Sequence, residues 1–213
     1  MGENQERRQA HRQKRGLLRV EEILHTAGAL FAEVGYNQAT TNMIAARAGI
    51  SPGSLYQFFS NKEAITQAFA ADVTKSLHQM YDAMLSSEVI NLPLQAFMDT
   101  LIDNLIAFNR NNPGYLALEF GSTISSPLAL VLAEFNKGSL AHLDALFAAR
   151  WHHSTQEQRH LPLLVSYRLF LALLPLILQD DGEHQCAIVR EMKVCLYRYW
   201  EPIMGSQEVS ATP

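Results

Sequence analysis

Apolar residues recur at intervals of three and four along most of the 213-residue chain, which is the spacing of one face of an α-helix. No stretch alternates apolar and polar residues for long enough to indicate a β-strand, and only 8 Pro and 11 Gly interrupt the helical pattern. The chain is therefore predicted to be all-α. A first helix is expected over about 17–34, where Gly35 ends it, and a longer one over about 61–85.

Two short helices joined by a glycine turn are predicted between these longer helices. Thr40 or Thr41 caps the first of them, and Gly49 ends it because glycine adopts a positive φ without steric cost. Ser51 caps the second, and Pro52 suits its first position, where a backbone N–H would have no helical partner. Two short helices at a tight turn are typical of a helix-turn-helix, whose second helix enters the major groove of DNA.

The rest of the chain is predicted to form a separate helical body. The helix that begins near Asn61 would be about 37 Å long, which is enough to join a small head to such a body. A later segment, SYRLFLALLPLIL, is expected at the centre of the body or at a subunit contact, with a kink or an end at Pro175. Five further helices are expected over about 92–111, 113–120, 127–151, 155–178 and 183–203.

Charge is distributed unevenly along the chain, although the net charge is only −4. Residues 1–20 hold six Lys and Arg against two Glu, whereas residues 64–213 hold nine Lys and Arg against fifteen Asp and Glu. One end of the protein is therefore expected to meet a polyanion. A basic tail alone indicates little, because most such tails are only solvated. Beside a helix-turn-helix it suggests an arm that reaches an adjacent groove.

Signals for membrane insertion and secretion are weak. The longest uninterrupted apolar stretch, 169–178, is too short to span a bilayer, and the polar N-terminus lacks the apolar core of a signal peptide. We therefore expect a cytoplasmic protein without a membrane partner. Cys186 and Cys195 would lie about 13 Å apart on one helix, too far for a disulfide, and are interpreted as packing residues.

Motifs for metal binding and catalysis are also missing from the sequence. His152, His153 and His160 lie close together with Glu157 between them, but a junction between helices favours solvent exposure of these side chains. The chain has no His pair at helical ligand spacing, no CxxC, no glycine-rich phosphate loop and no recognisable nucleophile setting. No metal, no other cofactor and no enzymatic activity are therefore expected.

Three stretches of the head carry a family resemblance: ALFAEVGYNQATT, IAARAGIS and SLYQFFSNKEAI. Over about Val20 to Ile65, this pattern closely resembles the TetR family of transcriptional regulators. The resemblance implies a homodimer whose heads enter successive major grooves of a double-stranded DNA operator, and a body that releases DNA when an effector binds. The body matches the family only in its helix count and order. The signature of the third stretch falls on Leu55, Tyr56, Phe58, Phe59, Lys62 and Glu63.

The resemblance and the helical pattern together predict four parts of the chain. Residues 1–16 form a basic, flexible arm, and 17–63 form the helix-turn-helix DNA-binding domain. Residues 64–205 form the helical domain for effector binding and dimerisation, and 206–213 form a frayed tail.

Candidate DNA contacts follow from the resemblance and from side-chain chemistry. Thr41 suits a phosphate oxygen, while Tyr56 and Lys62 look like the family's phosphate-binding tyrosine and backbone-anchoring lysine. The short side chains that begin the second helix let it lie deep in the groove, where Pro52 can contact a thymine methyl and Ser54 a base edge or a phosphate. The full set is Thr41, Asn42, Ser51, Pro52, Gly53, Ser54, Tyr56, Gln57 and Lys62.

Alternative roles remain open for several head residues. Thr41 can serve as a cap alone, and Arg47 is as readily a solvated surface charge as a DNA contact. Four apolar residues are interpreted as packing groups that attach the second short helix to the first and fourth helices: Ile50, Leu55, Phe58 and Phe59.

The body offers aromatic and flexible residues for a small, largely apolar effector. The same residue types fill any helical core, so this alternative stays open. The helix break at 109–113 is a place where a ligand could shift a hinge. The candidate effector residues are Met84, Phe97, Leu101, Asn104, Phe108, Tyr115, Glu119 and Phe170.

The dimer face is expected on the last two helices, packed with those of the partner as a four-helix bundle. Three functions stay open: a ligand-responsive repressor, which we favour; a related regulator that responds to a protein partner or to none; and a helical enzyme or carrier that does not bind DNA. Candidate dimer residues are Tyr167, Phe170, Leu174, Met192, Leu196 and Tyr199.

Overall fold

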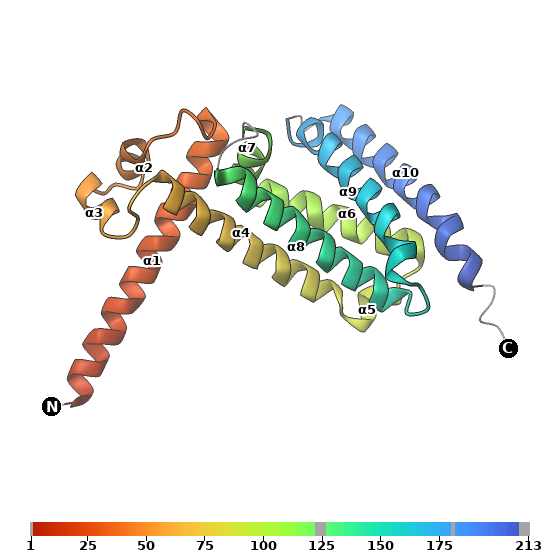
Figure 1. The fold of residues 1–213 in the computed structure, drawn as a ribbon, viewed down its shortest axis with the longest axis horizontal. Coiled ribbons are helices and arrows are strands. Elements are labelled where there is room, and N and C mark those ends of the chain that lie inside the picture. Colours follow the sequence, from red (N-terminus) through yellow and green to blue (C-terminus); the bar gives the residue numbers. More distant parts are fainter. Residues whose placement is uncertain (1, 122–126, 180–181, 209–213) are drawn as a thin grey trace. The chain divides into compact units, whose positions relative to one another are not determined.

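A computed structural model describes residues 2–121, 127–179 and 182–208 of the chain (Figure 1). Within these ranges, the side chains of 2–10, 12, 119–121, 127, 128, 131 and 205–208 are not described. The described ranges contain helices and no strand, which confirms the all-α prediction. The helices are α1 (Gly2–Val34), α2 (Thr41–Arg47), α3 (Pro52–Tyr56), α4 (Lys62–Met84), α5 (Ser87–Ile90), α6 (Leu94–Asn111), α7 (Pro113–Gly121), α8 (Pro127–Arg150), α9 (Gln156–Gln179) and α10 (Glu183–Glu208).

The first helix begins earlier than the sequence pattern predicted. We expected residues 1–16 to be a flexible arm, but α1 already begins at Gly2. Glu, Gln, Arg, Lys and Ala dominate this stretch, all of them have high helix propensity, and no proline interrupts it. Within the stretch, the Arg15 Nε donates to Nδ1 of His11, one helical turn away, at 3.0 Å.

Three further differences concern where helices begin and end and whether a proline interrupts them. The short α5 was not predicted, because four residues are too few for a periodic pattern. Instead of ending at Pro175, α9 continues through it, and the buried neighbours Leu174 and Ile177 provide packing that offsets the lost backbone hydrogen bond. At the C-terminus, α10 extends to Glu208, whereas 209–213 of the predicted tail lie outside the described residues.

Contacts divide the chain into two units. Unit 1 comprises Met1–Thr74 and Asn112–Ala133, and unit 2 comprises Lys75–Asn111 and Glu134–Pro213. This division differs from the predicted boundary after residue 63. The first half of α4 belongs to unit 1, and so do α7 and the beginning of α8.

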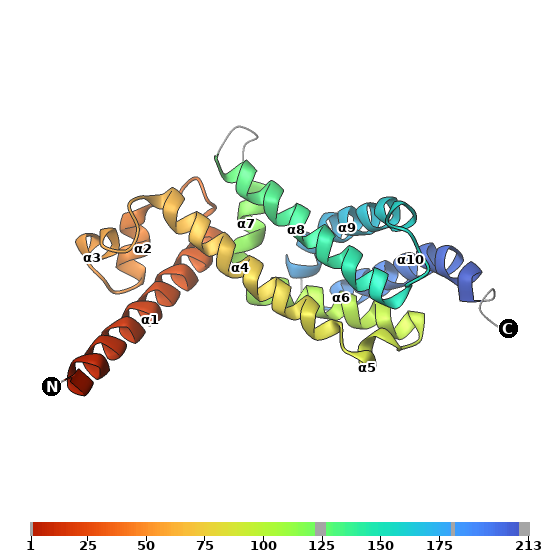
Figure 2. The ribbon, with the colours of Figure 1, turned by 60° about the horizontal axis from the view of Figure 1, so that its bottom comes forward.

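The core of unit 1 is formed by the inner faces of α1, α2, α3 and α4. Phe31 on α1 is fully buried and meets Phe69 on α4 edge to face, with ring centroids 6.1 Å apart. The two short helices lie beside the C-terminal half of α1 in both ribbon views (Figures 1 and 2). Other buried side chains of this core are Ile23, Leu24, Ala27, Leu30, Ile44, Ala45, Leu55, Phe59 and Ile65.

Gly114 lets α7 pack directly against the backbone of α1 at Gly28. A Cβ added at Gly114 would lie 2.4 Å from the carbonyl oxygen of Gly28 and 2.5 Å from its Cα. A Cβ at Gly28 would in turn lie 2.6 Å from a ring carbon of Phe69. Beside this contact, Tyr115 and Leu118 of α7 are buried. The two backbones therefore touch at a place where no larger residue fits without a shift of one helix.

Unit 2 has a cluster of aromatic rings at its centre. Phe147 on α8 lies 4.5 Å from Trp200 on α10 and 5.6 Å from Phe97 on α6, measured between ring centroids. All three side chains are buried, and the indole Nε1 of Trp200 donates to Oγ of Ser166 on α9 at 2.9 Å. In both views, α9 and α10 run side by side (Figures 1 and 2).

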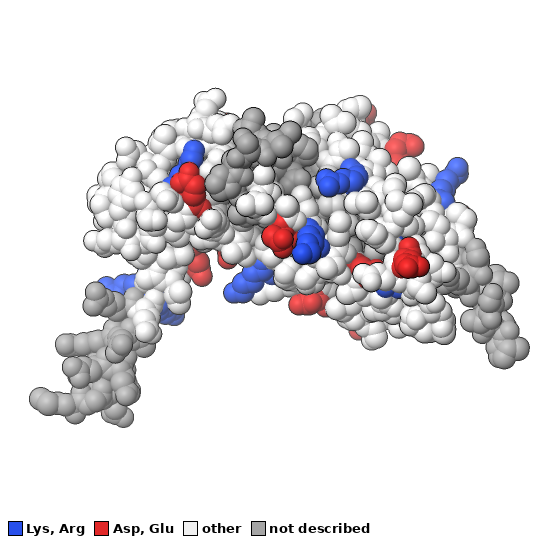
Figure 3. Space-filling model, viewed as in Figure 1, with Lys and Arg blue, Asp and Glu red and all other residues white. Residues whose placement is uncertain are grey.

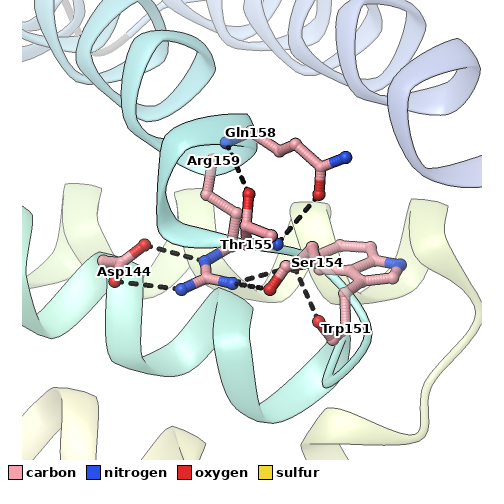
Figure 4. A network of polar contacts seen from close by, with 6 residues as sticks. All are labelled: Asp144, Trp151, Ser154, Thr155, Gln158 and Arg159. Atoms are coloured by element: carbon pink, nitrogen blue, oxygen red, sulfur yellow. Dashed lines mark hydrogen bonds and ion pairs between the residues drawn. The ribbon is translucent and has the colours of Figure 1, made fainter.

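A buried arginine fixes the turn between α8 and α9 (Figure 4). Arg159 donates to both carboxylate oxygens of Asp144, at 2.8 and 3.2 Å, and also to the backbone oxygen of Ser154 at 2.6 Å. Thr155 and Gln158 bond to each other's backbone N–H, at 2.8 and 3.3 Å, as in a capping box. This network determines where α9 begins.

The glycine contact predicts a position that does not tolerate alanine. Gly114→Ala should lower the free energy of unfolding by about 1–3 kcal/mol, because the new methyl group overlaps the backbone of α1. Gly16→Ala is the matched control, since a Cβ there meets nothing within 4 Å and a helical Gly→Ala change is worth about 0.5–1 kcal/mol in the stabilising direction. Urea denaturation followed by circular dichroism measures both. Equal stability of Gly114→Ala and the wild type would contradict this packing.

Candidate nucleic-acid interface and ligand cavity

The turn between α2 and α3 is defined by caps at both helices. The Thr40 Oγ1 accepts from the N–H of Met43 at 3.2 Å, so Thr40 rather than Thr41 is the cap of α2. Gly49 has a φ of 65°, and the N–H of Ile50 donates to the carbonyl of Ala45 at 3.0 Å, as in a Schellman motif. The predicted glycine turn is confirmed.

The start of α3 follows the predicted pattern as well. The Ser51 Oγ accepts from the N–H of Ser54 at 3.1 Å and lies 2.9 Å from the Ser54 hydroxyl. Pro52 is the first residue of the helix. Behind it, Leu55 is fully buried and Phe59 is nearly so, which confirms their interpretation as packing groups.

Phe58 and Met43 are more exposed than their apolar character suggested. Phe58 was expected in the core, but its exposed fraction is 39%, because α3 ends at Tyr56 and the following turn directs Phe59 inward instead. Met43 on α2 is exposed to a similar degree. Both residues lie on the outer side of the helix-turn-helix, so sequence pattern alone missed two apolar groups beside the candidate DNA contacts.

The candidate contacts on α2 and α3 are accessible. Asn42, Pro52, Gly53 and Gln57 are exposed, as is Ser51, while Thr41 and Ser54 are half-buried. Tyr56 has an exposed fraction of 51%, and its hydroxyl lies 3.2 Å from Oγ1 of Thr41. This hydrogen bond joins the end of α3 to the beginning of α2 and brings the two predicted phosphate contacts together.

Lys62 is held inside unit 1. Its Nζ donates to the carbonyl oxygens of Tyr36 and Ala39, both at 3.0 Å, and lies 4.4 Å from the centre of the Tyr36 ring. Burial raises the pKa of Tyr36, and the carboxylate of Glu63 adds to this effect. Two of the three ammonium hydrogens are therefore used to anchor the loop before α2, and a contact of Lys62 with phosphate stays a prediction.

Positive charge is sparse in the candidate contact set. Lys62 is the only Lys or Arg in it, and Arg47 on α2 forms an ion pair with Glu33 on α1. Lys14 and Arg15 of α1 are exposed. On the face drawn in Figure 3, the described residues are mostly uncharged, and several cationic and acidic groups lie next to one another. Hydrogen-bonding side chains, rather than a cationic cluster, characterise α2 and α3.

A cavity of about 40 Å³ lies within unit 2, between α6, α8, α9 and α10. Of the predicted effector residues whose side chains the structure describes, Leu101 and Phe170 line it and the others do not. The spacing of aromatic residues identified the core but not the side of each helix that faces a gap. The lining residues are Met98, Leu101, Ile102, Leu105, Leu143, Phe147, Leu163, Ser166, Tyr167, Phe170, Leu196 and Trp200.

The other predicted effector residues occupy different places. Phe97 belongs to the aromatic cluster, and Tyr115 is buried in unit 1. Met84 and Phe108 are buried in unit 2 away from the cavity lining, and the half-buried Asn104 does not line it either. The side chain of Glu119 lies outside the described residues.

The predicted dimer face needs correction in its residues. Five of the six candidates, namely Tyr167, Phe170, Leu174, Met192 and Leu196, are buried within unit 2, and Tyr199 is half-buried. Because α9 is apolar almost all round, its sequence does not reveal which face is inside. The exposed apolar residues are Leu161, Val165 and Leu176 on α9, at 63%, 44% and 50%, and Val194 on α10. Cys186 and Cys195, interpreted as packing residues, are exposed as well.

The helix α9 is also more apolar than we expected from the sequence. By length and composition this helix could cross a membrane, since its 18-residue window reaches a mean hydropathy of 2.1. Only 33% of that window is buried inside the chain's own fold, so α9 presents an uncovered apolar face. Arg168 is exposed in the middle of this helix.

No cluster of metal ligands is found in the described part of the chain. There, no group of three or more His, Cys, Asp or Glu is arranged to hold a metal ion. The rings of His152 and His153 lie 4.0 Å apart, and both side chains are exposed.

Comparison with known protein families covers both units. A family model described as "Bacterial regulatory proteins, tetR family" matches residues 23–69. A second model, "Tetracyclin repressor-like, C-terminal domain", matches residues 93–199, half of the chain. The chain belongs to the TetR family. Members of this family are DNA-binding transcriptional regulators that bind operators and typically dimerise.

Relatives of this TetR-family protein include regulators and a nucleoid factor. The Nucleoid occlusion factor SlmA of Haemophilus ducreyi is 30% identical over 52% of this chain and 55% of the relative. The HTH-type transcriptional regulator UidR of Escherichia coli is 31% identical over 45% of this chain and 54% of the relative. The chain thus spans about half the length of the curated relatives it matches.

A solved structure shares the fold. The transcriptional regulator FadR of Bacillus subtilis in complex with stearoyl-CoA aligns with a TM-score of 0.60 and 16% identity, over 83% of this chain and 97% of that one. At this identity the likeness concerns the fold alone.

The Tyr56–Thr41 hydrogen bond makes the tyrosine hydroxyl testable as a DNA contact. Tyr56→Phe should leave the fold intact, because the ring is half exposed, and should weaken operator binding about threefold to tenfold through loss of one hydrogen bond. Fluorescence anisotropy with a fragment of the native promoter measures affinity, and circular dichroism measures the melting temperature. Tyr197→Phe on α10, which loses a comparable bond to Glu201, is the control and should not change DNA affinity. Unchanged affinity of Tyr56→Phe would exclude this contact.

Proposed function

We propose that this TetR-family regulator is a homodimeric repressor that acts in the cytoplasm and leaves a palindromic operator when a small, largely apolar effector binds. The observation that carries this proposal is the leading turn of α3, Ser51–Ser54, which has only short side chains, is exposed at its first three residues and lies above the buried Leu55. Such a turn can approach the floor of a major groove closely, because no long side chain keeps it away.

DNA reading by this surface would combine positioning and base contacts. Thr41 and Tyr56 carry hydroxyl groups suited to phosphate oxygens, while Asn42 and Gln57 offer amides suited to adenine. Because Lys62 uses two of its hydrogens within the head, its main contribution is to hold the loop before α2 in place. Additional positive charge would come from the basic residues of α1.

Dimerisation through α9 and α10 is supported by the uncovered apolar face. Leu161, Val165 and Leu176 lie at spacings of four and eleven along α9, which puts them on one side of the helix. Leaving these side chains in water is unfavourable, and a second copy of the same face would cover them in an isologous contact. The exposed Arg168 among them makes a bilayer a poorer match than a protein partner.

Effector binding is supported by the cavity in unit 2. The FadR structure with a similar fold was determined with stearoyl-CoA, which is a property of that protein. A cavity between α6, α8, α9 and α10 offers this chain a place for a ligand of its own. A coupling free energy of about 1–3 kcal/mol between ligand and DNA would change operator affinity by roughly 5- to 150-fold.

Operator binding should depend strongly on salt. If Lys and Arg side chains of the dimer neutralise about eight phosphates, the logarithm of affinity should fall against the logarithm of salt concentration with a slope of about −7. Gel shift with the DNA upstream of the protein's own gene measures this slope, and random duplex of the same length is the control. A salt-independent affinity, or equal binding to random duplex, would refute the regulatory function.

The dimer proposal predicts the effect of a charge on α9. Leu176→Asp should convert the dimer to monomers and lower operator affinity, because a carboxylate would be buried without a partner in the subunit contact. Leu130→Asp on α8 is the matched control, since that leucine is also well exposed but lies in unit 1. Analytical ultracentrifugation gives the masses. A Leu176→Asp variant that stays dimeric would place the subunit contact elsewhere.

A further inference from the structure

The lining of the cavity in unit 2 narrows the class of ligand that the cavity can accept. We propose that it binds the uncharged, mainly apolar part of a small molecule through one oxygen acceptor, which receives the hydroxyl hydrogen of Ser166. This inference rests on the ligand-responsive function proposed above, but it concerns binding and can be tested without DNA.

The first argument is the absence of charge around the cavity. Its lining contains no Asp, Glu, Lys, Arg or His among the described residues. An ion that entered would lose its hydration without gaining a counter-charge, which is strongly unfavourable. The part of the ligand inside the cavity is therefore neutral.

The second argument is the bonding of the polar groups in the wall. The Tyr167 hydroxyl donates to Oδ1 of Asn136 at 2.6 Å, and the Trp200 indole donates to Oγ of Ser166 at 2.9 Å. Both of these donors are thus already used within the protein. Ser166 accepts a hydrogen bond, so its own O–H hydrogen is left for another acceptor.

The orientation of Ser166 differs from that of other hydroxyl groups on helices of this protein. Several such groups donate to the carbonyl four residues earlier, including Thr100 to Ala96 at 2.7 Å and Ser139 to Phe135 at 3.0 Å. For Ser166 the bond to a described residue is the one from Trp200. Because Ser166 lines the cavity, a carbonyl or ether oxygen of a ligand there is a suitable acceptor.

The third argument is size. A volume of about 40 Å³ holds a few water molecules at most, since each needs about 10–15 Å³, whereas an apolar cavity of about 150 Å³ takes benzene. A ring-sized ligand must therefore displace lining side chains. Met98 is unbranched and flexible, and Leu105 is half-buried, so these two can move most easily. Ligand entry would then change the packing of α6 against the other helices.

The experiment uses the full chain and three probes with the same six-membered ring. Isothermal titration calorimetry at pH 7 measures binding of cyclohexanone, which has one acceptor, methylcyclohexane, which has none, and cyclohexanecarboxylate, which is charged. Cyclohexanone and methylcyclohexane should bind, and cyclohexanecarboxylate should not. Binding of the carboxylate as tight as that of the ketone would overturn the proposal.

The role of Ser166 is tested by comparing the affinity of each probe for the wild type and for a variant without this hydroxyl. Ser166→Ala should weaken binding of cyclohexanone about threefold to tenfold, the value of one hydrogen bond, and leave methylcyclohexane binding unchanged. Ser139→Ala removes a buried hydroxyl that does not line the cavity and should affect neither probe. An equal loss for both probes in Ser166→Ala, or no loss for either, would overturn the assignment of Ser166.

A variant with a larger cavity keeps the test decisive. Leu143→Ala removes a buried side chain from the wall and should strengthen binding of both neutral probes. If neither probe binds even to a folded Leu143→Ala protein, the cavity is not a ligand site.

If the probes bind as expected but operator affinity does not respond to any ligand, the cavity assignment stands and the ligand-responsive function fails. If a metabolite releases DNA with equal affinity in the wild type and Ser166→Ala, the function stands and this inference fails.

Discussion

The burial of Leu55 and Phe59 is the constraint on which the DNA-binding head depends. With only five residues, α3 is too short to be stable alone, so its conformation comes from these side chains and from the Ser51 cap. Its inner face supplies stability, and its outer face is left with small or polar groups. Specificity can therefore vary on one side of the helix without loss of the fold on the other.

Elsewhere in unit 1, a close backbone contact at two glycines restricts how α1 and α7 can move relative to each other. Gly28 and Gly114 bring the backbones of α1 and α7 together, so a displacement of α7 has little room before it meets α1. In unit 2, the aromatic cluster around Phe147 and the ion pair of the buried Arg159 with the half-buried Asp144 hold α8 against its neighbours. By contrast, flexible aliphatic side chains form part of the wall of the cavity in unit 2.

Local signals predicted the head well, and they failed where a choice of face was needed. Gly49, Ser51 and Pro52 fulfil requirements set by their immediate neighbours, so their roles could be predicted from the sequence. By contrast, Leu174 and Leu176 are both apolar and only two positions apart, yet one is buried and the other exposed. Only tertiary packing distinguishes them. The carbonyl contacts of Lys62 likewise depend on a loop some 23 residues away in sequence, which no spacing rule anticipates.

The two sides of α9 have different surroundings. One side lines the cavity with Ser166 and Phe170. The other side exposes Leu161, Val165 and Leu176. If subunits associate through that outer side, a molecule whose binding on the inner side also shifts the outer side changes the association constant. Thermodynamic reciprocity then requires that apparent ligand affinity vary with total protein concentration. Cellular abundance of the regulator would in that case tune its own sensitivity.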